Sequence, residues 1–124
     1  MSKTENTRTK IKAQIVELLD AVNFNLYSFN FDDGKYCVDF GFYSDAGEDF
    51  IVTLWFDGTR KDFVNEFQNY AFNFDADEHA EAWVDMRGQN GVPDSIRTLM
   101  DDSDSIQERL VEASDKLIRM TRKD

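Results

Sequence analysis

The chain has 124 residues, of which 41% are hydrophobic and 14% aromatic, and it carries a formal net charge of −11 with a single cysteine. This length and apolar content predict one folded domain over residues 1–124 and exclude a disordered chain, and the short apolar runs exclude a membrane span. One cysteine excludes an internal disulfide framework, and the polar N-terminus lacks the apolar core of a secretory signal, so we expect a cytoplasmic protein.

The first predicted element is an amphipathic helix over residues 9–22. Its apolar residues fall on one side of a helix with 3.6 residues per turn. This stripe consists of Ile11, Ile15, Leu18, Leu19 and Val22. Residues 1–8 are polar, and we expect them to be frayed outside the helix.

Three strands are predicted next, over residues 24–31, 35–43 and 50–56. The apolar phase of the first strand slips between Leu26 and Phe29, which either a β-bulge or an end effect would explain. The other two strands alternate, so that they share one apolar face. This face consists of Tyr36, Val38, Phe40, Phe42, Phe50, Val52, Leu54 and Phe56. Short connections favour an antiparallel meander.

The opposite face of these strands mixes apolar and polar residues. It carries Cys37, Asp39, Ile51, Thr53 and Trp55. The face is either open to a partner or covered by the C-terminal helices. Because exposed apolar patches are uncommon on monomers, we expect the helices to cover it.

The remainder of the chain is predicted to be helical. Thr59 caps a helix that continues to Ala71, and Asp75 caps a second helix that ends near Gly88. A break then precedes a short helical segment over residues 93–100.

The last predicted helix is capped by Ser103. Its apolar residues recur at intervals of four and three, the spacing of a buried seam. They are Ile106, Leu110, Ala113, Leu117 and Met120. The main elements therefore predict an α+β fold in the order αβββααα: an N-terminal helix, a three-stranded antiparallel meander and then three helices. We expect the first helix and the helix after Thr59 to cover the apolar face of the sheet.

The charge of the chain is concentrated in its middle. Between Asp32 and Asp104 there are 18 acidic and 5 basic residues, a net of −13, whereas the two ends together carry 7 acidic and 9 basic residues, a net of +2, and −13 + 2 = −11. Helix caps and turns use several of these carboxylates but do not require so few lysines and arginines. Such a surface repels nucleic acids and membranes and attracts basic proteins.

No motif for catalysis, a cofactor or a metal stands out. His79 lies in the first turn of a predicted helix, where we expect a surface or capping role, and Cys37 is distant from it in sequence. The stretch 101–112 approximates a calcium loop but has Ile106 where glycine is needed. We therefore predict a protein without enzymatic activity, cofactor or metal. An enzyme with a cleft on the mixed sheet face is the least favoured interpretation.

The C-terminal part of the chain resembles a known kind of module. The resemblance rests on residues 74–83 (FDADEHAEAW), 91–96 (GVPDSI) and 106–117. Together they resemble the C-terminal module of small, uncharacterised acidic proteins from gut Firmicutes and their mobile elements. This module brings no catalytic residues, and the same setting is rich in antirestriction and anti-CRISPR proteins that imitate DNA.

These observations predict a small protein that binds a basic protein partner through its acidic surface, in the manner of a DNA-mimic, antirestriction-type inhibitor. Such a mimic must order its carboxylates in rows. The candidate partner-binding residues are Asp32, Asp33, Asp45, Glu48, Asp49, Trp55, Asp75, Asp77, Glu78, Glu81, Asp85, Asp101, Asp102 and Asp104. The alternative is a structural or regulatory module that self-associates as a homodimer and whose acidity serves solubility. Neither interpretation requires direct contact with nucleic acid or a membrane.

Overall fold

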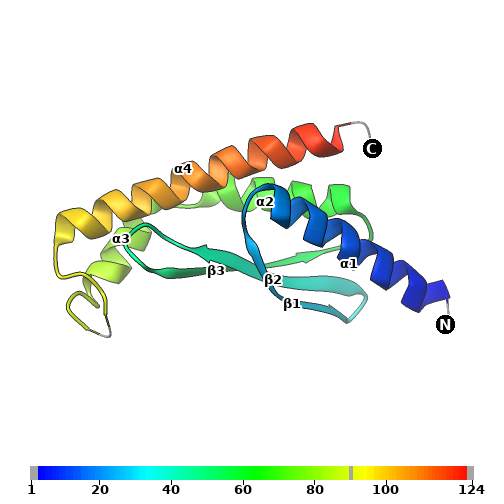
Figure 1. The fold of residues 1–124 in the computed structure, drawn as a ribbon, viewed down its shortest axis with the longest axis horizontal. Coiled ribbons are helices and arrows are strands. Elements are labelled where there is room, and N and C mark those ends of the chain that lie inside the picture. Colours follow the sequence, from blue (N-terminus) through cyan, green and yellow to red (C-terminus); the bar gives the residue numbers. More distant parts are fainter. Residues whose placement is uncertain (1–2, 90, 123–124) are drawn as a thin grey trace.

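The computed structural model describes residues 3–89 and 91–122 and shows a mixed α+β fold (Figure 1). In chain order the elements are α1 (Lys3–Ala21), β1 (Asn25–Asp32), β2 (Lys35–Tyr43), β3 (Asp49–Phe56), α2 (Arg60–Asn73), α3 (Ala76–Val84) and α4 (Ile96–Thr121). The predicted fold class, one helix followed by an antiparallel meander and three helices, is confirmed. None of the helices in the described part of the chain combines the length and the apolar character that crossing a bilayer requires.

The first helix is longer than predicted. α1 begins at Lys3 rather than at Thr9, so residues 3–8, which we expected to be frayed, form its first turns, while residues 1–2 lie outside the described residues. An apolar stripe marks only the part of a helix that packs on a core. A polar extension of the same helix therefore leaves no periodic signal in the sequence.

The last helix is continuous where two separate segments were predicted. The cap of α4 is Ser95, whose hydroxyl accepts a hydrogen bond from the backbone nitrogen of Thr98 at 3.3 Å. Ser103, the predicted cap, is instead fully buried inside the helix, between Leu99 and Ile106 on its buried side. Serine is a favoured N-cap residue, and a serine at a buried position interrupts the apolar pattern of a helix. For both reasons the sequence suggested that one helix ended and another began near Ser103.

The sheet has the strand order β1-β2-β3, and both pairings are antiparallel. The pairing register of β1 with β2 shifts between Leu26 and Ser28, as it does at a β-bulge. This shift explains why the apolar alternation of the strand slips between Leu26 and Phe29. β2 and β3 pair without a shift, with Val38 opposite Leu54 and Asp39 opposite Thr53. Since side chains alternate across a strand, this register assembles one apolar and one mixed face.

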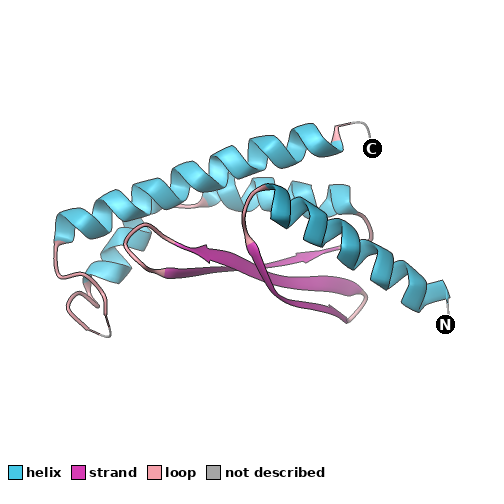
Figure 2. Ribbon diagram, viewed as in Figure 1, coloured by secondary structure: helices cyan, strands magenta, loops and turns pink. Residues whose placement is uncertain are grey.

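The core lies between the apolar sheet face and the helices, which cover that face as Figure 2 shows. The ring of Phe40 stacks on Phe67 at a centroid distance of 5.7 Å and meets Phe63 edge-on at the same distance. Ile15 of α1 and Leu110 of α4 complete the same buried cluster. The predicted cover by α1 and α2 is confirmed, and α4 adds to it.

Gly41, in the middle strand, provides a test of how closely β2 and β3 approach each other. A Cβ atom built on it would lie 1.9 Å from the carbonyl oxygen of Phe50 in the neighbouring strand. Because that obstacle is backbone, Gly41→Ala must displace β3, and we expect a loss of about 2–3 kcal/mol in the free energy of unfolding, measured by urea denaturation. Gly58→Ala is the matched control, since a Cβ atom added there would meet no atom within 4 Å. Equal stability of the two variants would contradict the close approach at Gly41.

Candidate functional site

Most of the acidic candidates lie at one end of the molecule, which we call the acidic end and which occupies the left of Figure 1. It consists of residues 44–49, 75–85 and 96–104, that is, the β2–β3 connection, α3 and the beginning of α4. Its candidates are Asp45, Glu48, Asp49, Asp75, Asp77, Glu78, Glu81, Asp85, Asp101, Asp102 and Asp104. Asp32 and Asp33 lie in the β1–β2 turn at the other end of the sheet, so the structure does not bring them to this group.

Glu48 is engaged inside the fold rather than exposed to a partner. Its carboxylate oxygen Oε2 lies 2.9 Å from Nε2 of His79, and both side chains are mostly buried. The His79 ring also packs against Phe50 and Phe74, at centroid distances of 5.5 and 5.4 Å. His79 therefore ties α3 to the β2–β3 connection, a role that we did not predict because its partner is 31 residues away in sequence.

Asp102 is the clearest correction among the predicted binding residues. Only 4% of it is exposed, and its Oδ1 accepts a hydrogen bond from the backbone nitrogen of Ala46 at 2.8 Å. This contact fastens the β2–β3 connection to α4. A buried carboxylate that is occupied in this way serves the fold, so Asp102 is not part of an accessible binding surface.

The described residues form no arrangement suited to a metal ion. The stretch 101–112, weighed above as a calcium loop, lies within α4 and is helical throughout. In residues 3–89 and 91–122, no group of three or more histidine, cysteine, aspartate or glutamate side chains is placed to hold a metal.

A row of carboxylates on α3 borders a groove between α3 and α4, which we call the α3–α4 groove. Asp77 and Glu81 on α3 and Asp85 at its C-terminal cap are spaced four residues apart, so they follow one line. Ile96 and Met100 of α4 line the same groove and are each about half exposed. The groove has a volume of about 640 Å³. It combines an apolar floor with an acidic border.

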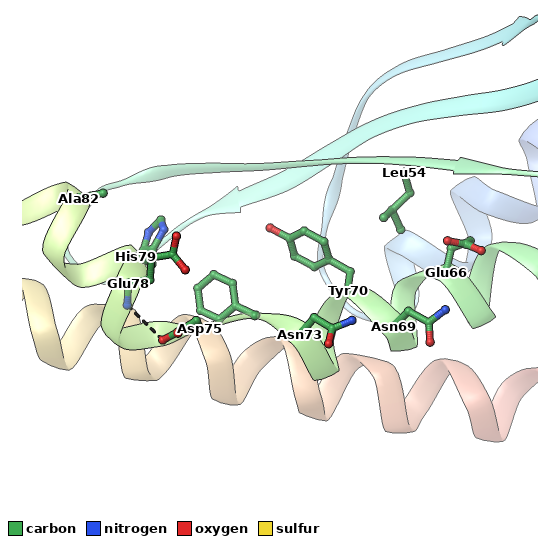
Figure 3. A pocket seen from close by; sticks show the side chains of 10 residues that line it. Leu54, Glu66, Asn69, Tyr70, Asn73, Asp75, Glu78, His79 and Ala82 are labelled. Atoms are coloured by element: carbon green, nitrogen blue, oxygen red, sulfur yellow. Dashed lines mark hydrogen bonds between the residues drawn. The ribbon is translucent and has the colours of Figure 1, made fainter.

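A second groove, which we call the β3 groove, runs between β3 and the helices α2 and α3 (Figure 3). It has a volume of about 570 Å³. Its lining residues are Leu54, Glu66, Asn69, Tyr70, Asn73, Phe74, Asp75, Glu78, His79 and Ala82. Three of these are carboxylic acids and none is lysine or arginine. Asp75 also caps α3, because its Oδ1 accepts hydrogen bonds from the backbone nitrogens of Asp77 and Glu78.

The mixed face of the sheet is open. We expected the C-terminal helices to cover it, and this is wrong, because the helices pack on the apolar face. Ile51 is 52% exposed and Trp55 45% exposed, so the candidate Trp55 does lie on an accessible surface. The sheet has one continuous apolar face, and the apolar stripes of the helices pack on that face. No apolar stripe of these helices is then directed at the mixed face.

A polar network crosses the centre of this open face. Asp39 accepts hydrogen bonds from the Thr53 hydroxyl at 2.6 Å and from the Ser28 hydroxyl at 2.7 Å. The bond from Thr53, followed by the bond from Ser28, lowers the pKa of the Asp39 carboxyl below its ordinary value. Burial, and secondarily the charges of Asp39 and Asp32, raise the pKa of the Cys37 thiol. Cys37 therefore holds its proton more firmly than an ordinary thiol, which makes it a poor nucleophile.

The lowered pKa of Asp39 predicts a pH-dependent contribution to stability. A carboxyl whose pKa is lower in the folded state stabilises the fold above its unfolded pKa, and that stabilisation is lost as pH falls through the folded pKa. We expect Asp39→Asn to cost about 1–2 kcal/mol at neutral pH and the difference from the parent to shrink below about pH 4. Urea denaturation across this range measures the difference. In the control Asp57→Asn, at the exposed end of β3, the change should be small at neutral pH; a pH-independent cost for Asp39→Asn would contradict the network.

Comparisons with known proteins do not assign this chain to a family. No protein-family model matches the sequence, and searches of curated proteins and of solved structures find no significant match. Function therefore has to be inferred from the acidic end, the two grooves and the open sheet face themselves.

Proposed function

We propose that this protein is a non-enzymatic, cytoplasmic binding module whose acidic end docks on a basic surface of another protein. The observation that carries the proposal is the α3–α4 groove, where Asp77, Glu81 and Asp85 form one row beside the exposed Ile96 and Met100. Carboxylates that served solubility alone would need no such apolar floor. A basic partner would gain from both, because charge steers the encounter and apolar contact holds the complex.

The finer form of this proposal is that the partner is a DNA-binding protein and that the acidic end occupies its DNA site. Carboxylates four residues apart on a helix rise by about 6 Å, whereas each DNA strand carries one phosphate per about 3.4 Å. The α3 row therefore has about half the charge density of one strand. Asp45, Asp49, Asp101 and Asp104 are further exposed carboxylates of the acidic end that would have to supply more. The resemblance of the C-terminal segment to modules from mobile elements favours this partner class.

Two triple variants with equal charge distinguish a local site from a general effect of net charge. We expect Asp77→Asn, Glu81→Gln and Asp85→Asn together to weaken capture of the basic partner about tenfold, since each exposed ion pair contributes about half a kcal/mol. The partner is captured from the extract of the native host on the immobilised chain and eluted with a salt gradient. Elution with duplex DNA tests the finer proposal.

The matched control removes three charges at the opposite end of the molecule, through Asp32→Asn, Asp33→Asn and Asp57→Asn. These three residues are exposed and lie at the ends of strands, away from α3. We expect this variant to retain its partner. If both variants lose the partner equally, net charge alone accounts for capture, and this result would contradict a binding site at the acidic end.

A second candidate function is self-association through the open sheet face. It is favoured by the exposure of Ile51 and Trp55 on a face that the helices do not cover. Apolar contact between two copies would make such a dimer insensitive to salt, in contrast to a complex held by charge.

Sedimentation velocity at low and high salt tests this second candidate. If two copies pack through the sheet face, Trp55→Ser should shift the chain to monomer at both salt concentrations. Phe72→Ser is the control, because Phe72 is an aromatic residue on α2 that is 84% exposed and does not belong to the sheet. A monomeric parent chain at all concentrations and salts would exclude the candidate.

A further inference from the structure

β3 has one edge that carries no partner strand. The sheet order β1-β2-β3 pairs β3 with β2 alone, and no further strand occurs in the described part of the chain. An edge strand presents backbone N–H and C=O groups that can pair with another chain. Proteins protect such edges with charges, bulges or short strands, whereas the interior of β3, from Phe50 to Phe56, carries no charge and pairs without a bulge. This edge is therefore suited to accept a strand.

The β3 groove lies between this strand and the two helices beyond it. In Figure 3, Leu54 extends from β3 toward α2, while Glu66 and Tyr70 extend from α2 toward β3. Side chains from one face of an added strand would enter this space. There they would meet the carboxylates of Glu66, Asp75 and Glu78, with no lysine or arginine among the described lining residues. Charge complementarity thus selects basic side chains for that face of the incoming strand.

The other face of an added strand would lie beside the open face of the sheet. Its side chains would be neighbours of Ile51, Thr53 and Trp55, which alternate along β3 with the groove-side residues. Two of these three are large, apolar and about half exposed. Cross-strand pairs of apolar and β-branched residues stabilise a sheet. The two faces of β3 together specify an alternation of basic and apolar residues.

We propose that the β3 groove binds an extended segment of a partner protein as a fourth strand, with lysine or arginine at alternate positions and apolar residues between them. This deepens the proposed function and rests on it, because it takes the partner of the acidic end to be basic. A second copy of this chain is disfavoured as the occupant. It would bring the same carboxylates against Glu66 and Glu78 and add another net charge of −11.

The probe is a synthetic octapeptide in which lysine and valine alternate, titrated into the isotopically labelled full-length chain. We expect the backbone amides of β3 to shift in the NMR spectrum and those on the outer edge to exchange more slowly with solvent, because they become hydrogen bonded. Two isomeric peptides, N-methylated either on every lysine or on every valine, form a matched pair. Successive N–H groups point to opposite sides of a strand, so one isomer should lose at least about tenfold in affinity. The other isomer should bind like the parent peptide.

A pair of protein variants tests the charge selection. Glu66→Gln with Glu78→Gln should weaken binding of the octapeptide about tenfold, whereas Glu17→Gln with Glu112→Gln, exposed residues on α1 and α4, should not. Equal affinity of the two N-methylated isomers, or shifts that spare β3, would overturn the inference. Binding lost on substitution of Asp77, Glu81 and Asp85 but not of Glu66 and Glu78 would also overturn it, while leaving the proposed function intact. Failure of partner capture at the acidic end would instead remove the proposed function.

Discussion

The burial of one apolar sheet face is the constraint on which the rest of this structure depends. Three strands present that face, and α1, α2 and α4 cover it, with Phe40 packed between Phe63 and Phe67 at its centre. Each fully buried phenylalanine contributes roughly 1.5–3 kcal/mol, so this cluster outweighs any single polar contact on the surface. Because every long helix packs on the same side, the opposite sheet face and the outer edge of β3 stay uncovered.

The acidic residues divide into those that hold the fold and those that face solvent. Asp62 completes the capping box of α2, Asp102 fastens the β2–β3 connection to α4, and Glu48 pairs with His79. These carboxylates are engaged in contacts within the fold and would lose those contacts on binding a partner. Asp77 and Glu81 lie instead at the border of a groove. Asp77 and Glu81 thus add negative charge to the acidic end without taking part in the contacts made by Asp62, Asp102 and Glu48.

α3 borders both grooves because it lies between them. Its Asp77 and Glu81 border the α3–α4 groove, and its Glu78 and His79 line the β3 groove. Adjacent sides of this one helix therefore present carboxylates to both openings. A single basic partner that contacts the acidic end can reach both grooves, and the position of α3 depends on the cap at Asp75 and on the contact of His79 with Glu48. The site is therefore coupled to the packing of the β2–β3 connection.

The sequence by itself determined the order of the elements, since the alternation in β2 and β3 and the stripes in the helices report directly which side of each element is buried. The slipped phase near Leu26 was also visible in the sequence, which left a bulge and an end effect both open; the structure shows a register shift there. Only the tertiary structure decided that Asp102 is buried, that His79 meets Glu48, and that the face carrying Trp55 stays open. Local patterns record the periodicity of one element, whereas these features depend on which distant elements meet. For the same reason, the acidity of the middle of the chain was visible in the sequence, but its concentration around α3 follows from the packing of α3 against α4.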